Sequence, residues 1–205
     1  MAARFFVNGG VNNNWGDTSN WSTTSGGAGG QTVPALTDAV TLDQNSPNCI
    51  VDGTTGRNAG GLDFTNYTNQ LTLNNLILNN GSLTLGAGMK PILGMGSFSF
   101  TSAGTKILTS NGIVIPNLVL NAVSPTISLA DNLYISGMIY MASTNNVVGG
   151  KTIYVMGGCC FVGGASATSI TGALILLNPV KMSANGALAA LNNKTSFVGY
   201  NQTHQ

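Results

Sequence analysis

Aspartate is the only acidic residue type in this chain of 205 residues, so any carboxylate chemistry rests on six side chains. Two carboxylates close together can hydrolyse a glycosidic bond, but Asp38 and Asp43 lie five positions apart, which on an extended strand places them on opposite faces. Asp52 and Asp63 stand in turn sequences, where aspartate commonly caps the backbone. The pattern favours turn-capping aspartates over a catalytic pair or a weak Ca²⁺ site of carboxylates and backbone carbonyls. The six are Asp17, Asp38, Asp43, Asp52, Asp63 and Asp131.

Few other residues could serve as nucleophile, base or metal ligand. The single histidine, His204, is second from the end of the sequence, and a terminal residue is poorly suited to be a positioned catalytic base. Cys49, Cys159 and Cys160 show neither a CxxC motif nor the Cys/His spacing of a zinc site. We expect them to be buried or idle thiols. The sequence therefore predicts no enzyme activity, no cofactor and no metal.

Both tryptophans, Trp15 and Trp21, lie in a stretch rich in Asn, Ser and Gly that would otherwise be typical of a linker. Tryptophan is a good anchor for a protein interface and a good platform for a sugar ring. It can also plug the open end of a β core, where apolar surface and unpaired strand edges need a cover. The stretch is interpreted as an ordered cap or subunit contact, with a glycan contact as the alternative.

Composition excludes several classes of partner. Charged residues make up 6% of the chain, against about 25% in an average soluble protein, and the net charge of +1 gives no long-range attraction to nucleic acid or to an anionic membrane. No segment reaches the roughly 18 apolar residues of a membrane span, and the N-terminal segment carries no apolar signal region. A surface of neutral Gly, Asn, Ser and Thr suits a protein held in a large assembly.

The local pattern predicts strands. From about residue 61 onward, short runs alternate apolar and polar residues and are separated by Asn and Gly, which is typical of half-buried strands and turns. Glutamate is absent and lysine is scarce, so helix is disfavoured. The fold class is therefore all-β.

Spacing of the runs favours a parallel β-solenoid with an N-terminal cap. The segments 79–85 and 110–115 look like one repeated unit, and 76–79 and 118–121 look like a second recurring type. Stacked coils of roughly 20–25 residues would fit about five coils into the repetitive zone. A β-sandwich or jelly roll, which usually has longer strands, stays open as the alternative.

Three zones follow from these patterns. Residues 1–60 form a capping and anchoring segment with the first strands, residues 61–180 form the repetitive β domain, and residues 181–205 form a tail. Within the tail, a short helical turn capped by Ser183 or Asn185 and a last or docking strand at 194–200 are expected.

The N-terminal zone resembles a group of tailed-phage and prophage virion-associated proteins of β-solenoid character. The likeness covers residues 4–90 best and includes Phe6 at a position where tryptophan is common. It is carried, in chain order, by Arg4-Phe-Phe-Val-Asn-Gly-Gly, Trp15, Asn20-Trp21-Ser22, Ser25-Gly-Gly-Ala-Gly-Gly, and Val33-Pro34 followed by Asp38-Ala-Val.

This resemblance implies a non-enzymatic structural protein of a bacteriophage virion, either a capsid decoration or fibre subunit or a short tail-fibre or baseplate component. Its partners would be other virion proteins and copies of itself, with a trimer favoured by analogy to fibres and decorations. The alternative is a carbohydrate-binding adhesin or depolymerase module acting on host-surface glycans. The expected interface and anchor residues are Arg4, Phe5, Phe6, Trp15 and Trp21, the two tryptophans being also the candidates for weak glycan contact.

Overall fold

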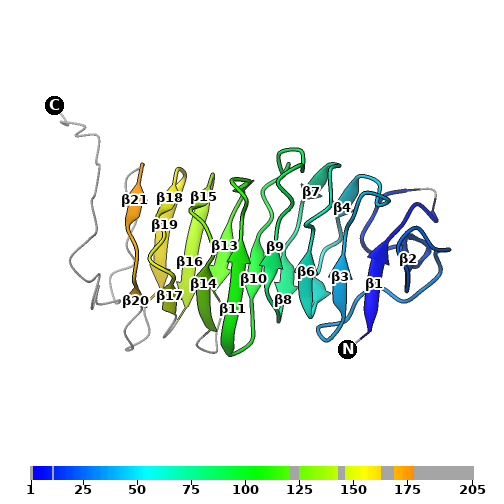
Figure 1. Ribbon diagram of the computed structural model, residues 1–205, viewed down its shortest axis with the longest axis horizontal. Coiled ribbons are helices and arrows are strands. Elements are labelled where there is room, and N and C mark those ends of the chain that lie inside the picture. Colours follow the sequence, from blue (N-terminus) through cyan, green and yellow to red (C-terminus); the bar gives the residue numbers. More distant parts are fainter. Residues whose placement is uncertain (1, 11, 121–124, 143–145, 163–168, 178–205) are drawn as a thin grey trace.

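The computed structural model describes residues 2–10, 12–120, 125–142, 146–162 and 169–177, and within them the protein is all-β apart from one turn of 3-10 helix, η1 (Thr18–Asn20). Parallel strands stack into a β-solenoid whose coils follow one another along the long axis (Figure 1). The predicted fold class is therefore confirmed, and the sandwich alternative is wrong. The turn and strand expected in the tail, and His204, lie outside the described residues.

The solenoid has three sides, which the chain visits in the same order in every coil. The first side contains β1 (Ala3–Phe6), β2 (Trp21–Ser22), β3 (Ala39–Thr41), β6 (Gly61–Asp63), β9 (Leu83–Thr84), β11 (Gly104–Thr109), β14 (Pro125–Leu129), β17 (Asn146–Val148) and β20 (Ser169–Ile170). The second side contains β4 (Cys49–Val51), β7 (Leu71–Leu73), β12 (Val114–Ile115), β15 (Leu133–Ile135), β18 (Ile153–Val155) and β21 (Leu174–Leu176). The third side contains β5 (Arg57–Ala59), β8 (Ile77–Asn79), β10 (Phe98–Phe100), β13 (Leu118–Leu120), β16 (Met138–Ala142) and β19 (Gly158–Val162).

Six complete coils and the start of a seventh follow from this order. Coil 3 has no strand on the second side. A single parallel bridge between Thr72 and Leu93 shows where coil 3 crosses that side. The pairing of Val40 with Leu62, and of Tyr134 with Tyr154, gives the step from one coil to the next. The coils are, in order, β3–β4–β5, β6–β7–β8, β9–Leu93–β10, β11–β12–β13, β14–β15–β16, β17–β18–β19 and β20–β21.

One of the two predicted repeats is the true one. Ile77 pairs with Phe98 and Phe98 with Leu118, so residues 77–79 and 118–120 hold the same place on the third side, two coils apart, and the predicted match of 76–79 with 118–121 is one residue out of register. The relation between 79–85 and 110–115 is wrong as a repeat. Both segments begin at an Asn-Gly corner, but the first leads into β9 on the first side and the second into β12 on the second side.

The core is a set of parallel columns of apolar side chains. Strands such as β7, β13 and β15 alternate buried and half-buried residues, which is the period-2 signature of one face turned inward. On the first side the inward column, in which each residue pairs with the next, is Val40, Leu62, Leu83, Leu108 and Leu129, each at most 3% exposed. Full burial of one such side chain contributes about 1.5–3 kcal/mol.

The corner after β8 combines a buried amide with a close backbone approach. Asn79 is fully buried, and its Nδ2 donates to the carbonyl oxygen of Gly81 at 2.9 Å while its Oδ1 accepts the Gly81 N–H at 3.1 Å. A Cβ on Gly81 would lie only 2.0 Å from the carbonyl oxygen of Gly60 in the preceding coil. Glycine at this corner is thus required for the coils to stack at backbone distance.

Gly81→Ala is expected to lower the free energy of unfolding by about 1–3 kcal/mol, because the added methyl group must push two coils apart. Chemical denaturation followed by circular dichroism measures the change. Gly88→Ala is the matched control, since a Cβ there meets only the methyl group of Thr68 at 3.3 Å. Equal stability of the two variants would contradict the close stacking of the corners.

Candidate functional site

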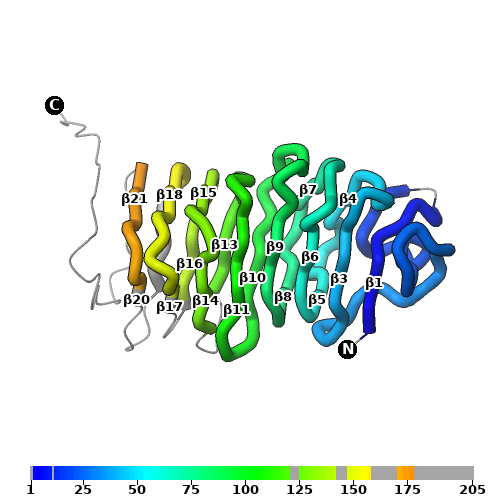
Figure 2. Tube along the Cα trace, viewed as in Figure 1, coloured from blue at the N-terminus to red at the C-terminus, as the bar shows by residue number. Residues whose placement is uncertain are grey.

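The N-terminal residues 2–38, here called the cap, close one end of the stack. β1 pairs in parallel with β3 and antiparallel with β2, so the ladder of the first side ends in a strand of opposite direction. On the second side Asn14 bridges Ile50 of β4 in coil 1. Figure 2 shows these loops gathered at the N-terminal end of the solenoid. The zone 1–60 thus contains the cap and the first full coil.

The two tryptophans are interior residues of this cap. Both rings have 0% exposure, they meet edge to face at 4.9 Å between centroids, and Phe6 lies against Trp21 at 5.2 Å. The Nε1 of Trp21 donates to the backbone oxygen of Trp15 at 2.7 Å. Neither tryptophan ring has a face open to a sugar or a subunit, and Phe6 is buried too, so this structure presents none of the three rings at its surface. The interpretation of the stretch as an ordered cap is confirmed, because the three side chains plug the end of the core.

Arg4 and Phe5 keep some exposure. Arg4 donates from Nε to the Thr32 oxygen at 3.2 Å and from a terminal nitrogen to the Thr32 hydroxyl at 3.0 Å, and it lies 3.9 Å from Asp38. It therefore ties the far part of the cap loop to β1. Phe5 is half-buried on the outward position of β1, between Ser22 and Thr41.

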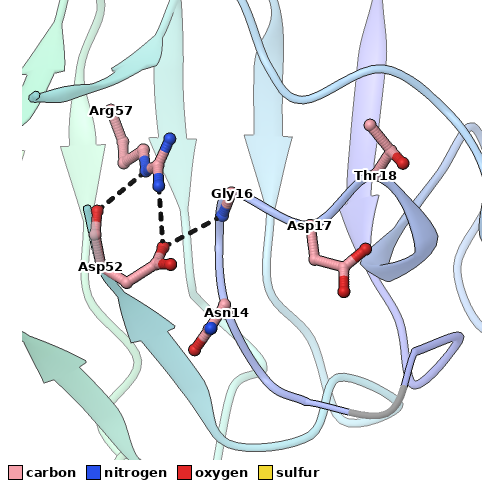
Figure 3. A pocket seen from close by; sticks show the side chains of 6 residues that line it. All are labelled: Asn14, Gly16, Asp17, Thr18, Asp52 and Arg57. Carbon is pink, nitrogen blue, oxygen red and sulfur yellow. Dashed lines mark hydrogen bonds and ion pairs between the residues drawn. The ribbon is translucent and has the colours of Figure 1, made fainter. Parts of the chain in front are cut away.

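A polar hollow of about 400 Å³ lies where the cap meets coil 1 (Figure 3). Asp52 connects the two parts, because one of its carboxylate oxygens accepts hydrogen bonds from the Gly16 N–H and from a terminal nitrogen of Arg57, both at 3.1 Å. Arg57 also donates from Nε to the Asp52 backbone oxygen at 2.9 Å. The remaining lining comes from Asn14, Asp17 and Thr18.

The residues beside the hollow hold the cap to coil 1, and Gly16, Asp52 and Arg57 are here called the clamp. A Cβ on Gly16 would lie 2.3 Å from the Arg57 guanidinium, and one on Gly53, which has a φ of +98°, would lie 2.5 Å from it. The two glycines therefore make room for the arginine over the Asp52 carboxylate. Sequence reasoning missed this set, because Gly16 and Asp52 lie far apart in the chain and nothing in the local pattern links them.

Most of the aspartates accept hydrogen bonds at turns, as the sequence predicts, but the prediction is wrong for Asp52, whose side chain accepts from Gly16 and Arg57 instead. Asp17 caps η1, and its hydrogen bonds from the side chain and backbone of Ser19 lower the pKa of its carboxyl group. Asp38 accepts from the Ala2 and Ala35 backbone, Asp43 from Asn45, Asp63 from Thr65, and Asp131 from Ser110 and Asn111. Within the described residues no three His, Cys, Asp or Glu side chains gather as a metal site would require.

The cysteines divide into one that is described and two that are not. Cys49 is a free thiol with 0% exposure on the inward face of β4. Burial, followed by the negative charge of Asp52, raises its pKa well above the usual value, which makes it a poor nucleophile. Cys159 and Cys160 pair by backbone register with Ile139 and Tyr140, and their side chains lie outside the described residues.

Tyr134 and Tyr154 form a second feature that the sequence reasoning missed. They pair across β15 and β18 on the outward face of the second side, and their rings stack at 4.9 Å between centroids with an angle of 4° between planes. The signal in the sequence was the similarity of Leu-Tyr-Ile at 133–135 to Ile-Tyr-Val at 153–155, which becomes visible once the coil length is known.

In comparisons with known proteins, no family model, no curated protein and no solved structure matches this chain. Through the described part of the chain, no helix has the length and apolar character needed to cross a membrane.

Trp21→Phe is expected to destabilise the protein by about 1 kcal/mol more than Trp15→Phe. Both changes shrink a buried ring, but only the first removes a hydrogen bond and leaves the Trp15 carbonyl oxygen without its donor. The Nε1 of Trp15 has no partner among the described atoms, so Trp15→Phe is the matched control. Thermal unfolding of both variants measures the difference. A larger loss for Trp15→Phe would contradict the description of the plug.

Proposed function

We propose that this chain is a non-enzymatic structural protein of a tailed-phage virion, either a capsid decoration or fibre subunit or a tail-fibre or baseplate component. The strongest support is the combination of a stack of parallel coils with aspartates that serve turns or the clamp. Such a molecule contributes shape and stiffness. The N-terminal resemblance to virion-associated proteins supplies the setting.

The mechanism is mechanical. Each coil bonds its backbone to the next, as in the N–H groups of Leu62 and Ile77, which donate to Ser82 and Ser97 at 2.9 Å. A rod held in this way presents few backbone groups to a protease and unfolds only by separating coils. Its surface of neutral hydrogen-bonding groups fits contacts with neighbouring virion subunits, which also include further copies of the chain.

The alternative is a carbohydrate-binding adhesin, and the outward tyrosines are the observation in its favour. Their geometry limits the idea, since Tyr134 and Tyr154 turn one ring face toward each other and leave fewer faces for a sugar. The depolymerase version has less support, because each aspartate accepts hydrogen bonds at a turn or a clamp.

Immunogold labelling of purified phage particles from the host that carries this sequence tests the proposal. We expect label at one fixed position on every particle, head or tail, and loss of that feature in particles lacking the gene. Protein found only in the lysate or on the bacterial surface, and absent from washed particles, would overturn it.

Retention on immobilised host polysaccharide separates the two candidate functions. A structural subunit should pass through the column like bovine serum albumin. Specific retention that Tyr154→Ala abolishes, with an unchanged circular dichroism spectrum, would instead favour the adhesin.

A further inference from the structure

Five of the seven exposed large hydrophobic side chains of the described residues lie on the second side of the solenoid or at its borders; the other two are Leu36 in the cap and Ile107 on the first side. Leu93, 52% exposed, and Val114, 40% exposed, lie on the second side, and Leu177, 47% exposed, directly follows its strand β21. Met95, at 89%, and Met138, at 47%, lie where the chain leaves this side for the third. Apolar groups gathered in this way mark an interaction surface.

The centre of this surface is an outward column whose polar groups are the hydroxyls of Thr72, Tyr134 and Tyr154. Backbone register joins Ile50 to Thr72 and Thr72 to Leu93, and it joins Val114 to Tyr134, Tyr154 and Ile175. Leu93 and Val114 are outward residues of the second side in the adjacent coils 3 and 4, although among the described residues no strand pairing joins these coils on that side. On the first side the comparable outward column contains Thr41, Asp63, Thr84 and Thr109 instead.

In coils 3 to 7 charge is confined to one edge of the apolar surface, whereas coil 1 carries Asp52 at the other edge, directly after β4. The segments 91–95, 112–116, 132–136, 152–156 and 173–177 contain no charged residue. Three positions before the outward column stand Lys90 in coil 3, Asp131 in coil 5 and Lys151 in coil 6. Coil 4 carries the neutral Asn111 at this place, midway between Lys90 and Asp131.

We propose that this apolar face binds the same face of a second copy of the chain, in an antiparallel pair whose two-fold axis passes through coil 4. A single patch that binds itself closes as a two-fold pair. In this arrangement coil 3 of one copy faces coil 5 of the other, so Lys90 stands opposite Asp131 twice. Val114 faces its own counterpart, and Leu93 faces Tyr134.

The size of the face sets the strength of the pair. Seven coils spaced about 4.8 Å apart, each about five residues wide, give a flat footprint of roughly 500 Å². A standard stable interface buries about 800 Å² on each partner. The uneven surface of the side chains adds to the area of the flat footprint, but it supplies only part of the difference. The pair is therefore expected to dissociate on dilution. The proposed assembly is a dimer where the sequence analysis expected a trimer, and it does not depend on where the protein acts.

Cross-linking tests the register. Purified Val114→Cys protein is treated with a short bismaleimide and should form a covalent dimer, because the two introduced thiols lie opposite each other. Tyr154→Cys should not, since coil 6 faces coil 2 and the two thiols are about 19 Å apart along the axis. Wild type under the same treatment controls for the native cysteines. Dimers from both variants would show a parallel pair, and none from Val114→Cys would show no pair; either result overturns the proposal.

Sedimentation velocity over a range of concentrations tests the face. Leu93→Lys should weaken dimerisation by roughly tenfold or more, because it places an unpartnered charge in the contact. Ile107→Lys is the matched control, since Ile107 is also 52% exposed but lies outward on the first side; it should change the association by less than about twofold. A wild-type protein that stays monomeric, a trimer, or equal effects of the two lysines would overturn the pairing. A monomer that binds polysaccharide through Tyr154 would assign the face to a glycan.

Discussion

The structure depends on one requirement, that every strand edge of a stacked coil must find a partner for its N–H and C=O groups. On the first and third sides consecutive coils meet it by pairing in parallel register, while the pairing on the second side is interrupted between coils 3 and 4. At the N-terminal end the antiparallel β2 ends the first side, and Asn14 covers part of the second. The buried Trp15 and Trp21 then close the apolar interior that those coils leave open.

Much of this architecture could be predicted, because period-2 alternation and Asn-Gly corners are local signals. The similarity of 76–79 to 118–121 indicated the spacing of two coils to within one residue, since residues 77–79 and 118–120 lie two coils apart. The relation of 79–85 to 110–115 was misleading for a physical reason. An Asn-Gly pair serves corners of different geometry, since Asn111 and Gly112 have positive φ and Asn80 and Gly81 do not, so similar sequences in these two segments lead into different sides.

Features that join distant parts of the chain could not be found locally. The clamp of Gly16, Asp52 and Arg57 needs the cap folded onto coil 1, and the outward column needs the coil register. The tryptophans show the same limit. A tryptophan indicates an ordered position in the fold. Whether its ring points inward or outward, however, depends on how β1 and β2 are placed on the end of the stack. The structure turns both rings inward.

Native-state hydrogen exchange tests most directly whether the coils form one continuous body. Amides that bond between coils, such as those of Leu62, Ile77, Leu133 and Ile153, should be strongly protected and should exchange with closely similar free energies. Such a result is expected when coils open only together. Exchange within seconds at these amides, or free energies that differ widely from coil to coil, would contradict a single rigid solenoid.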